Sequence, residues 1–207
     1  MTLDNPKFIQ KLQNRDFEAF KVLHDNYASK MKFVCLRYLK NDQDAEDTLQ
    51  EGFINIFKNI NQYSGKGSFE GWIKKTFINL AINKCKRDST FLSHQDLGDM
   101  EHIADESNEN NQYEQEDNKD YQNITLQQIE QINFTESELT NLLNNIPDHF
   151  RIVFSMYVID DYKHKDIAEL LNINEKTSKT RLSRARKLLQ TEVLKFAAIK
   201  LQIPIYE

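Results

Sequence analysis

The densest set of side chains suited to chemistry lies near the C-terminus, on a segment expected to be helical from Glu175 to about Leu189. Its cations have no acidic residue among them: Lys176, Lys179, Arg181, Arg184, Arg186 and Lys187. Leu182, Ala185, Leu188 and Leu189 leave an apolar stripe for packing. A cationic helix of this kind contacts phosphates and base edges in the major groove of DNA. The pattern favours binding to duplex DNA over the alternative, a merely solvated basic face.

The residues before this helix supply the arrangement that would present it. Residues 163–171 predict a short helix whose apolar side is Ile167, Ala168, Leu170 and Leu171. Residues 172–174 (NIN) predict a tight turn, and Asn174 is suited to cap the helix that follows. A short helix, a tight turn and a second, basic helix have the spacing of a helix-turn-helix.

A second cluster interleaves aromatic and cationic side chains. The aromatic residues are Tyr63, Phe69, Trp72 and Phe77, and the cations are Lys66, Lys74, Lys75, Lys84, Lys86 and Arg87. Such a mixture suits single-stranded DNA, because exposed bases stack on rings while cations follow the backbone. The alternative is that the aromatic residues belong to the core, which is expected for Phe77 and in part for Trp72. The turn at residues 64–68 (SGKGS) precedes this cluster.

No catalytic constellation accompanies these clusters. The five histidines (24, 94, 102, 149 and 164) include no His-Glu-x-x-His pair, and no glycine loop has the spacing of a phosphate site. The carboxylates of Asp44, Glu46, Asp47 and Glu51 are expected on an exposed helix face, which favours solvation or partner binding over acid–base work. The sequence therefore predicts a protein that is not an enzyme, without a cofactor or a bound metal.

The elements that position these residues read as helices throughout. Phe20, Leu23, Tyr27, Met31, Val34 and Tyr38 form one stripe at steps of three and four; Ala45, Leu49, Phe53, Phe57 and Ile60 form a second, on a helix beginning near Asp44. Trp72, Ile73, Phe77, Leu80 and Ala81 form a third. Thr135 and Glu138 match a capping box that opens the second helical unit. We expect an all-α chain of two small domains.

Charge marks the boundary between the two domains. The net charge is −5, but residues 96–120 alone hold ten Asp and Glu against one Lys. Residues 93–123 carry almost no apolar periodicity, so they are expected to form a flexible, solvated linker. The expected division is a domain at 1–90, an acidic linker at 91–134 and a helix-turn-helix domain at 135–207.

Composition excludes several classes of protein. Of the 207 residues 39% are hydrophobic, and no apolar run exceeds four residues, whereas a membrane-spanning helix needs about 20. The N-terminal residues do not have the pattern of a secretory signal. Cys35 and Cys85 form neither a disulfide framework nor a zinc-ligand pattern, and buried apolar roles are expected for both. A cytoplasmic, reduced protein is the expectation.

Taken together, these motifs resemble the bacterial RNA polymerase sigma factors of the extracytoplasmic-function (ECF) group. Residues 44–53 (DAEDTLQEGF) resemble the polymerase-binding helix of that family, and residues 69–73 (FEGWI) with 79–81 (NLA) resemble its promoter-melting helix. Residues 146–154, 162–168 and 177–186 are similar to its upstream-element domain. The three motifs occur in the family's order along the chain.

The resemblance implies residue roles. Polymerase contacts would come from Asp44, Asp47, Gln50, Glu51 and Phe53, facing a coiled coil of the largest subunit, with the flap of the second-largest subunit as a further partner. Melted minus-10 DNA, with a flipped base near Trp72, would be held by Tyr63, Lys66, Phe69, Trp72, Lys74, Lys75, Asn79, Asn83 and Arg87. Duplex minus-35 DNA would be read by Lys176, Thr177, Lys179, Thr180, Arg181, Arg184 and Lys187. The linker would pass near the polymerase channels, and an anti-sigma protein, often membrane-anchored, is a further partner class.

Several positions depart from the family pattern. Asn172 replaces a Gly of the turn, which Asn tolerates because it adopts the left-handed conformation. Ser178 replaces an apolar residue and is expected to loosen the packing of the basic helix. Gly52 interrupts the polymerase-binding helix at a cost of about 1 kcal/mol relative to Ala, and Asn83 replaces an Asp. The other hypothesis is a stand-alone helix-turn-helix regulator whose N-terminal helical domain dimerises or binds an effector.

Overall fold

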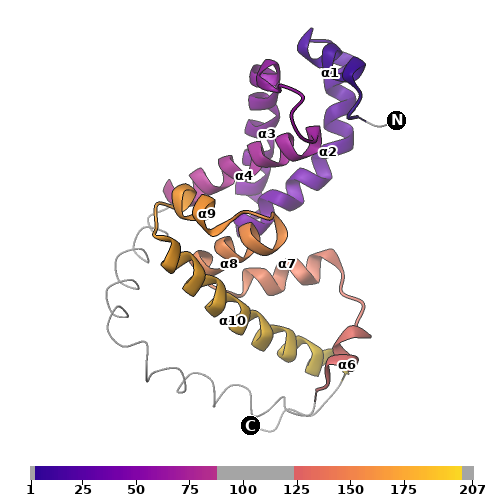
Figure 1. Cartoon of the computed structure of the whole chain (residues 1–207). Helices are drawn as coiled ribbons and strands as arrows, with labels where there is room; N and C mark the ends of the chain where they lie inside the picture. Colours follow the sequence, from indigo (N-terminus) through magenta and orange to yellow (C-terminus); the bar gives the residue numbers. More distant parts are fainter. Residues whose placement is uncertain (1–2, 88–123, 202–207) are drawn as a thin grey trace. The chain divides into compact units, whose positions relative to one another are not determined.

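Two compact units make up the chain, Met1–Asp88 (unit 1) and Ser89–Glu207 (unit 2). The computed structural model describes residues 3–87 and 124–201 (Figure 1). Every regular element in those residues is a helix, as the sequence pattern predicts. None of these helices is long and apolar enough to cross a membrane. Residues 93–123, expected to form the acidic linker, lie outside the described residues.

Unit 1 begins with short helix α1 (Pro6–Gln13), followed by α2 (Phe17–Tyr38) and α3 (Asp42–Asn59). The 3-10 turn η1 (Ile60–Gln62) and the loop at 64–68 then lead to α4 (Phe69–Arg87). Asn5, Asp16 and Asn41 cap the first three helices, each through a side-chain oxygen that accepts a backbone N–H. The apolar stripes do not predict α1, although Asn5 before Pro6 is an ordinary start signal for a helix.

The core of unit 1 forms where α2, α3 and α4 pack together (Figure 1). From the predicted stripe of α2, Leu23, Tyr27, Met31, Val34 and Tyr38 are all at most 6% exposed. Both cysteines are buried there, as expected: burial raises the pKa of the Cys35 thiol to about 12. Cys85 donates a hydrogen bond to the carbonyl oxygen of Tyr38 over 3.1 Å. The thiols therefore act as part of the apolar core.

Close packing of α3 on α4 explains Gly52. A Cβ built at this position would lie 2.0 Å from Cε1 of Phe77, a ring that is fully buried. The glycine therefore does more than weaken the helix, because its missing side chain provides the space that the Phe77 ring fills.

We expect Gly52→Ala to lower the free energy of unfolding of unit 1 by about 1–3 kcal/mol, the usual range for overpacking a core. Denaturant unfolding of the full chain measures this change. Since Leu in place of Phe77 relieves the clash, the same substitution in a Phe77→Leu background is expected to cost less. Equal costs in the two backgrounds would contradict the packing explanation.

Unit 2 contains α6 (Leu126–Glu130), α7 (Glu136–Asn144) and α8 (Asp148–Phe154), which continues as a π-helical stretch, η3 (Ser155–Ile159). Helices α9 (His164–Leu171) and α10 (Glu175–Leu201) follow. The capping box predicted at Thr135 and Glu138 is confirmed, and Thr125 forms a second one with Gln128. Helix α6 lies within the range expected as linker, 91–134.

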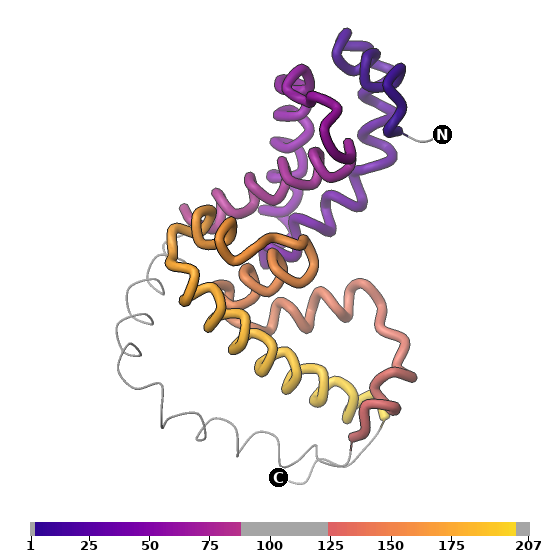
Figure 2. Tube along the Cα trace, viewed as in Figure 1, coloured from indigo at the N-terminus to yellow at the C-terminus, as the bar shows by residue number. Residues whose placement is uncertain are grey.

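Helix α10 ends at Leu201, well beyond the predicted end near Leu189. Its second half packs against the chain leading into α7 (Figure 2). The rings of Phe134 and Phe196 stack with centroids 5.4 Å apart, and Lys200 Nζ lies 2.8 Å from Glu138 Oε1. The Lys200 ammonium, together with the Thr135 backbone amide, lowers the pKa of Glu138 to about 2. These tertiary contacts, which periodicity does not encode, carry the helix past residue 189.

Candidate nucleic-acid and polymerase interfaces

The predicted helix-turn-helix is present in unit 2. Helix α9 ends at Leu171, and its C-cap Asn172 adopts the left-handed conformation at φ 56° and ψ 46°. Its backbone N–H and that of Ile173 satisfy carbonyls of the last turn of α9. Asn174 then accepts the backbone N–H of Thr177 over 2.6 Å, as the predicted cap of α10. Asn in place of Gly therefore preserves the turn.

The outer face of α10 carries most of the cations assigned to duplex DNA. Lys176, Lys179, Thr180, Arg184 and Lys187 are exposed, as is Arg186, while Thr177 is half-buried. Ser178, Leu182 and Ala185 are buried on the opposite side. Glu175 of the same helix pairs with Lys179: its carboxylate lies 3.7 Å from Lys179 Nζ, with both side chains largely exposed. Solvent screens such a pair, so the face remains cationic.

Arg181 differs from the other cations assigned to this face. Its side chain is 4% exposed, because position 181 lies on the same side of α10 as Ser178 and Ala185. A buried guanidinium is not presented to a DNA groove. This placement favours a role in the packing of unit 2, and the DNA contact assigned to Arg181 stays a prediction.

Ser178, expected to loosen the packing, instead takes part in a polar contact between the two helices of the motif. Its fully buried hydroxyl lies 2.9 Å from Nδ1 of His164 on α9. The His164 ring also stacks on Tyr157 with centroids 4.3 Å apart. Burial lowers the pKa of His164, and the neighbouring cations Lys179 and Arg186 act in the same direction while Glu175 opposes them. The fold therefore favours the neutral form of the imidazole.

This contact predicts a pH dependence of stability. Because the pKa of His164 is lower in the fold than its ordinary value near 6.5, the unfolded chain binds more protons between the two values. The stabilisation is complete above about pH 6.5 and is lost as the pH falls through the folded pKa. We expect the thermal unfolding midpoint of unit 2 to be lower at about pH 5 than at about pH 7.5. His164→Phe with Ser178→Val should reduce this difference, whereas His24→Gln in unit 1 should leave it unchanged.

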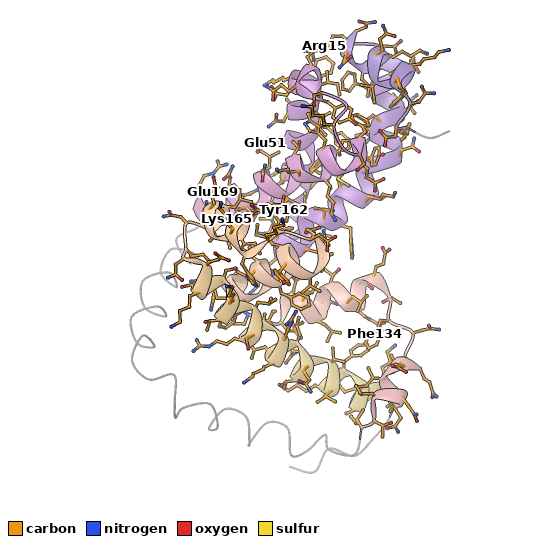
Figure 3. All side chains as sticks on the ribbon, viewed as in Figure 1. Arg15, Glu51, Phe134, Tyr162, Lys165 and Glu169 are labelled. Atoms are coloured by element: carbon orange, nitrogen blue, oxygen red, sulfur yellow. The ribbon has the colours of Figure 1, made fainter. Side chains whose placement is uncertain are left out.

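On α3, the residues assigned to polymerase binding separate into three environments. Asp47, Gln50 and Glu51 are exposed on one side of the helix (Figure 3 labels Glu51). Phe53 is half-buried, with its ring 5.3 Å from that of Phe77. Asp44 is half-buried and ion-paired. The exposed face is therefore formed by two carboxylates and one amide.

Lys84 of α4 is ion-paired with Asp44 and Asp47 of α3. Its Nζ lies 2.6 Å from Asp44 Oδ1 and 3.6 Å from Asp47 Oδ2. The pair with Lys84, helped by a hydrogen bond from Asn41, lowers the pKa of the Asp44 carboxyl. Lys84 is thus bound to α3 in this structure, and its expected contact with DNA phosphates stays a prediction.

The aromatic cluster lies where the loop at 64–68 meets α4. Ring centroids of Tyr63 and Phe69 are 5.1 Å apart, and those of Phe69 and Trp72 are 6.1 Å apart in a stacked arrangement. Tyr63 is 6% exposed and Phe69 is fully buried, so in this structure both rings pack within the cluster, and their assigned contacts with bases stay predictions. Trp72 is half-buried and remains the ring of the cluster with an accessible part.

The loop itself depends on glycine. Gly65 and Gly67 have φ of 76° and 82°, a region that other residues rarely adopt. Tyr63 Oη donates a hydrogen bond to the Gly67 carbonyl over 2.9 Å, which ties the loop to the aromatic cluster. Lys66 is exposed at its centre. The polar residues of α4 assigned to DNA then follow: Lys75, Asn83 and Arg87 are exposed, and Lys74 and Asn79 are half-buried.

Comparison with known families accounts for both units. Residues 23–90 match the family model for sigma-70 region 2, and residues 136–189 match that for sigma-70 region 4. The ECF sigma factor SigW of Bacillus subtilis is 28% identical over 192 residues, which cover 90% of this chain and 95% of that protein. The ECF sigma-E factor of Haemophilus influenzae is 22% identical over 199 residues, covering 92% and 96%. The chain belongs to the sigma-70 family, in its ECF group.

As a sigma factor, the protein binds core RNA polymerase and promoter DNA and directs transcription initiation. Solved structures also align with it at low similarity. One is CnrH in complex with the cytosolic domain of CnrY, with a TM-score of 0.45 and 13% identity over 88% of this chain and 92% of that chain. Another is RpoE in complex with the anti-sigma factor NepR from Bartonella quintana, with a TM-score of 0.45 and 18% identity over 85% and 96%.

Two features of this sigma factor lie outside the predicted site residues. The pair of His164 and Ser178 joins two positions fourteen residues apart, and the departure at Ser178 is the signal that points to it. The second is the N-terminal segment, where Asp4 accepts a hydrogen bond from the backbone N–H of Phe69. No periodic pattern marks Asp4, because the contact spans 65 residues of sequence.

Proposed function

We propose that the roles of this sigma factor are divided between its two units. The predicted domain at 1–90, which contains unit 1, binds core polymerase through Asp47, Gln50 and Glu51 and binds the melted minus-10 strand through Lys66, Trp72 and α4. The predicted domain at 135–207, the C-terminal part of unit 2, reads the minus-35 duplex through the exposed face of α10, and the linker at 91–134 joins the two domains.

The separation of charge within unit 1 carries this proposal. The exposed face of α3 holds Asp47 and Glu51, which suits a basic protein surface. Lys66 on the loop and Lys75 on α4 are exposed close in sequence to the half-buried Trp72, and Arg87 is exposed at the C-terminal end of α4. Cations beside an accessible ring suit a single strand, whose phosphates and bases they contact respectively.

We propose further that the protein has no catalytic activity of its own. The pKa of Asp44 lies below its ordinary value, the opposite of what a general acid at neutral pH requires. The carboxylates of Asp47 and Glu51 are exposed to solvent. The catalytic activity in transcription is that of the polymerase. An anti-sigma protein is a further proposed partner, on the basis of family membership alone.

Run-off transcription tests the proposed function. Core polymerase with this protein and a template library of random upstream sequence should give transcripts from a selectable set of promoters. Core polymerase alone should not select them. Binding of this protein to DNA in the absence of any polymerase-dependent transcript would instead favour the stand-alone regulator.

The exposed and buried cations of α10 should behave differently. We expect Lys179→Ala and Arg184→Ala to weaken binding to the selected minus-35 duplex while leaving thermal unfolding unchanged. Replacing a residue that reads a base should cost about 1–3 kcal/mol of binding free energy and relax specificity at one base position. Replacing a residue that contacts a phosphate should weaken binding to all sequences alike. Arg181→Ala is expected to lower the unfolding midpoint, because it removes a buried side chain. Lys195→Ala, beyond the matched region, is the control. Wild-type binding by the Lys179→Ala, Arg184→Ala double variant would show that the face is only solvated.

A further inference from the structure

Asp4 connects the N-terminus of the chain to the loop at 64–68. Its Oδ1 accepts the backbone N–H of Phe69, the first residue of α4, over 3.3 Å. Ser68 accepts two further amides of the first turn, since its Oγ accepts from Gly71 and its carbonyl oxygen from Trp72. The helix that follows the loop is therefore capped from two sides, one of them distant in sequence.

The charge of Asp4 is placed where it stabilises this arrangement. A carboxylate is favourable at a helix N-terminus because of the partial positive charge there. The same carboxylate lies near the Tyr63 ring: burial raises the pKa of Tyr63, and the negative charge of Asp4 raises it further. Tyr63 in turn holds the carbonyl of Gly67. Asp4 thus acts on both ends of the loop.

Helix α1 fixes Asp4 in place. Asn5 caps α1, and Leu12 of that helix is fully buried. After the helix, the Arg15 guanidinium lies 4.5 Å from the centroid of the Phe57 ring and donates to the Lys58 carbonyl over 3.3 Å (Figure 3 labels Arg15). Asp4 therefore projects from a segment that is attached to the end of α3. This segment precedes residue 23, where the match to region 2 begins.

We propose that Asp4 is a positioning residue that holds the loop at 64–68 and Trp72 in the arrangement that receives an extruded promoter base. The inference rests on the proposed role of this loop in unit 1. Extruding a base costs a few kcal/mol, so a loop already held in its binding conformation avoids a further ordering cost.

The free protein gives the first test. Trp72 is the only tryptophan of the chain and stacks on Phe69, so its fluorescence reports this cluster directly. We expect Asp4→Ala to shift Trp72 emission to longer wavelength and to raise acrylamide quenching about twofold, while helix content is unchanged. Asp4→Asn keeps an oxygen acceptor and should restore most of the wild-type signal. Asp25→Ala, another exposed carboxylate of unit 1, is the control. If acrylamide quenches Trp72 equally in the Asp4→Ala variant and in the wild-type protein, the proposal is overturned.

Promoter opening gives the second test, using the full chain with core polymerase and permanganate reactivity of unpaired thymines. Asp4→Ala should slow promoter opening about fivefold, the effect expected for a lost helix cap. Binding to core polymerase should be unchanged, and Asp4→Asn should restore the rate of opening. Faster opening would overturn the proposal, since it would show that the carboxylate competes with a DNA phosphate. If wild-type protein never opens a promoter, the proposed function fails and this role for Asp4 fails with it. The fluorescence test distinguishes the two failures, because it reports whether Asp4 holds the Trp72 cluster in the free protein, without polymerase or DNA.

Discussion

Reversing the charge of Asp47 and Glu51 together is expected to abolish association with core RNA polymerase. Both carboxylates are exposed on one side of α3, so arginine at these positions would meet a basic partner surface with like charge. Opposed like charges at an interface cost several kcal/mol. Co-purification with core enzyme and native gel shift measure the loss, and circular dichroism should show an intact helical fold.

The two positions are not equivalent, and single variants separate them. Asp47 Oδ2 lies 3.6 Å from Lys84, so arginine there also disturbs the ion pair of Lys84 with Asp44. Glu51→Arg alone avoids that pair and is expected to weaken association at least tenfold. Asp25→Arg, an exposed charge reversal on α2, should leave it unchanged. Normal co-purification of the double variant would refute the placement of the polymerase surface on α3.

Local signals in the sequence predict much of this fold. The three-and-four spacing from Leu23 to Tyr38 identifies the buried side of α2, because one face of a long helix must cover the core. Asn174 and the pair of Thr135 and Glu138 predict helix starts, since a cap needs only the residues of the first turn. Asn172 predicts its own left-handed conformation, because the short polar side chain of Asn allows it.

The parts that sequence does not predict depend on contacts between elements. A cationic residue on a basic helix looks suited to DNA, but the register in which α10 packs puts Arg181 on the buried side. Lys84 belongs with Asp44 because α3 and α4 adjoin, although 40 residues separate them. Tyr63 and Phe69 are likewise buried by contacts between elements. Composition gives the chemistry of a cluster, and tertiary packing decides which of its members face solvent.

The loop at 64–68 provides the second large effect, because opening DNA requires more than binding it. We expect Lys66→Ala with Gly67→Pro to leave core binding and closed-complex formation intact but to block strand opening. Proline fixes φ near −65°, whereas Gly67 adopts φ of 82° with its carbonyl bound to Tyr63 Oη. The substitution therefore breaks the tie between the loop and the aromatic cluster, and it removes the exposed ammonium of Lys66. Permanganate reactivity of thymines at the start site reports the result.

Three variants show which part of the loop matters. Gly67→Asn keeps a residue that tolerates positive φ, so it should open promoters close to the wild-type rate. Lys66→Ala alone removes the charge and keeps the backbone, and an intermediate loss is expected because phosphate contacts from α4 remain. Ser64→Ala, an exposed loop position, should have no effect. If the Lys66→Ala, Gly67→Pro variant opens promoters normally, the loop is only a connector, and Trp72 with the exposed cations of α4 must hold the melted strand without it.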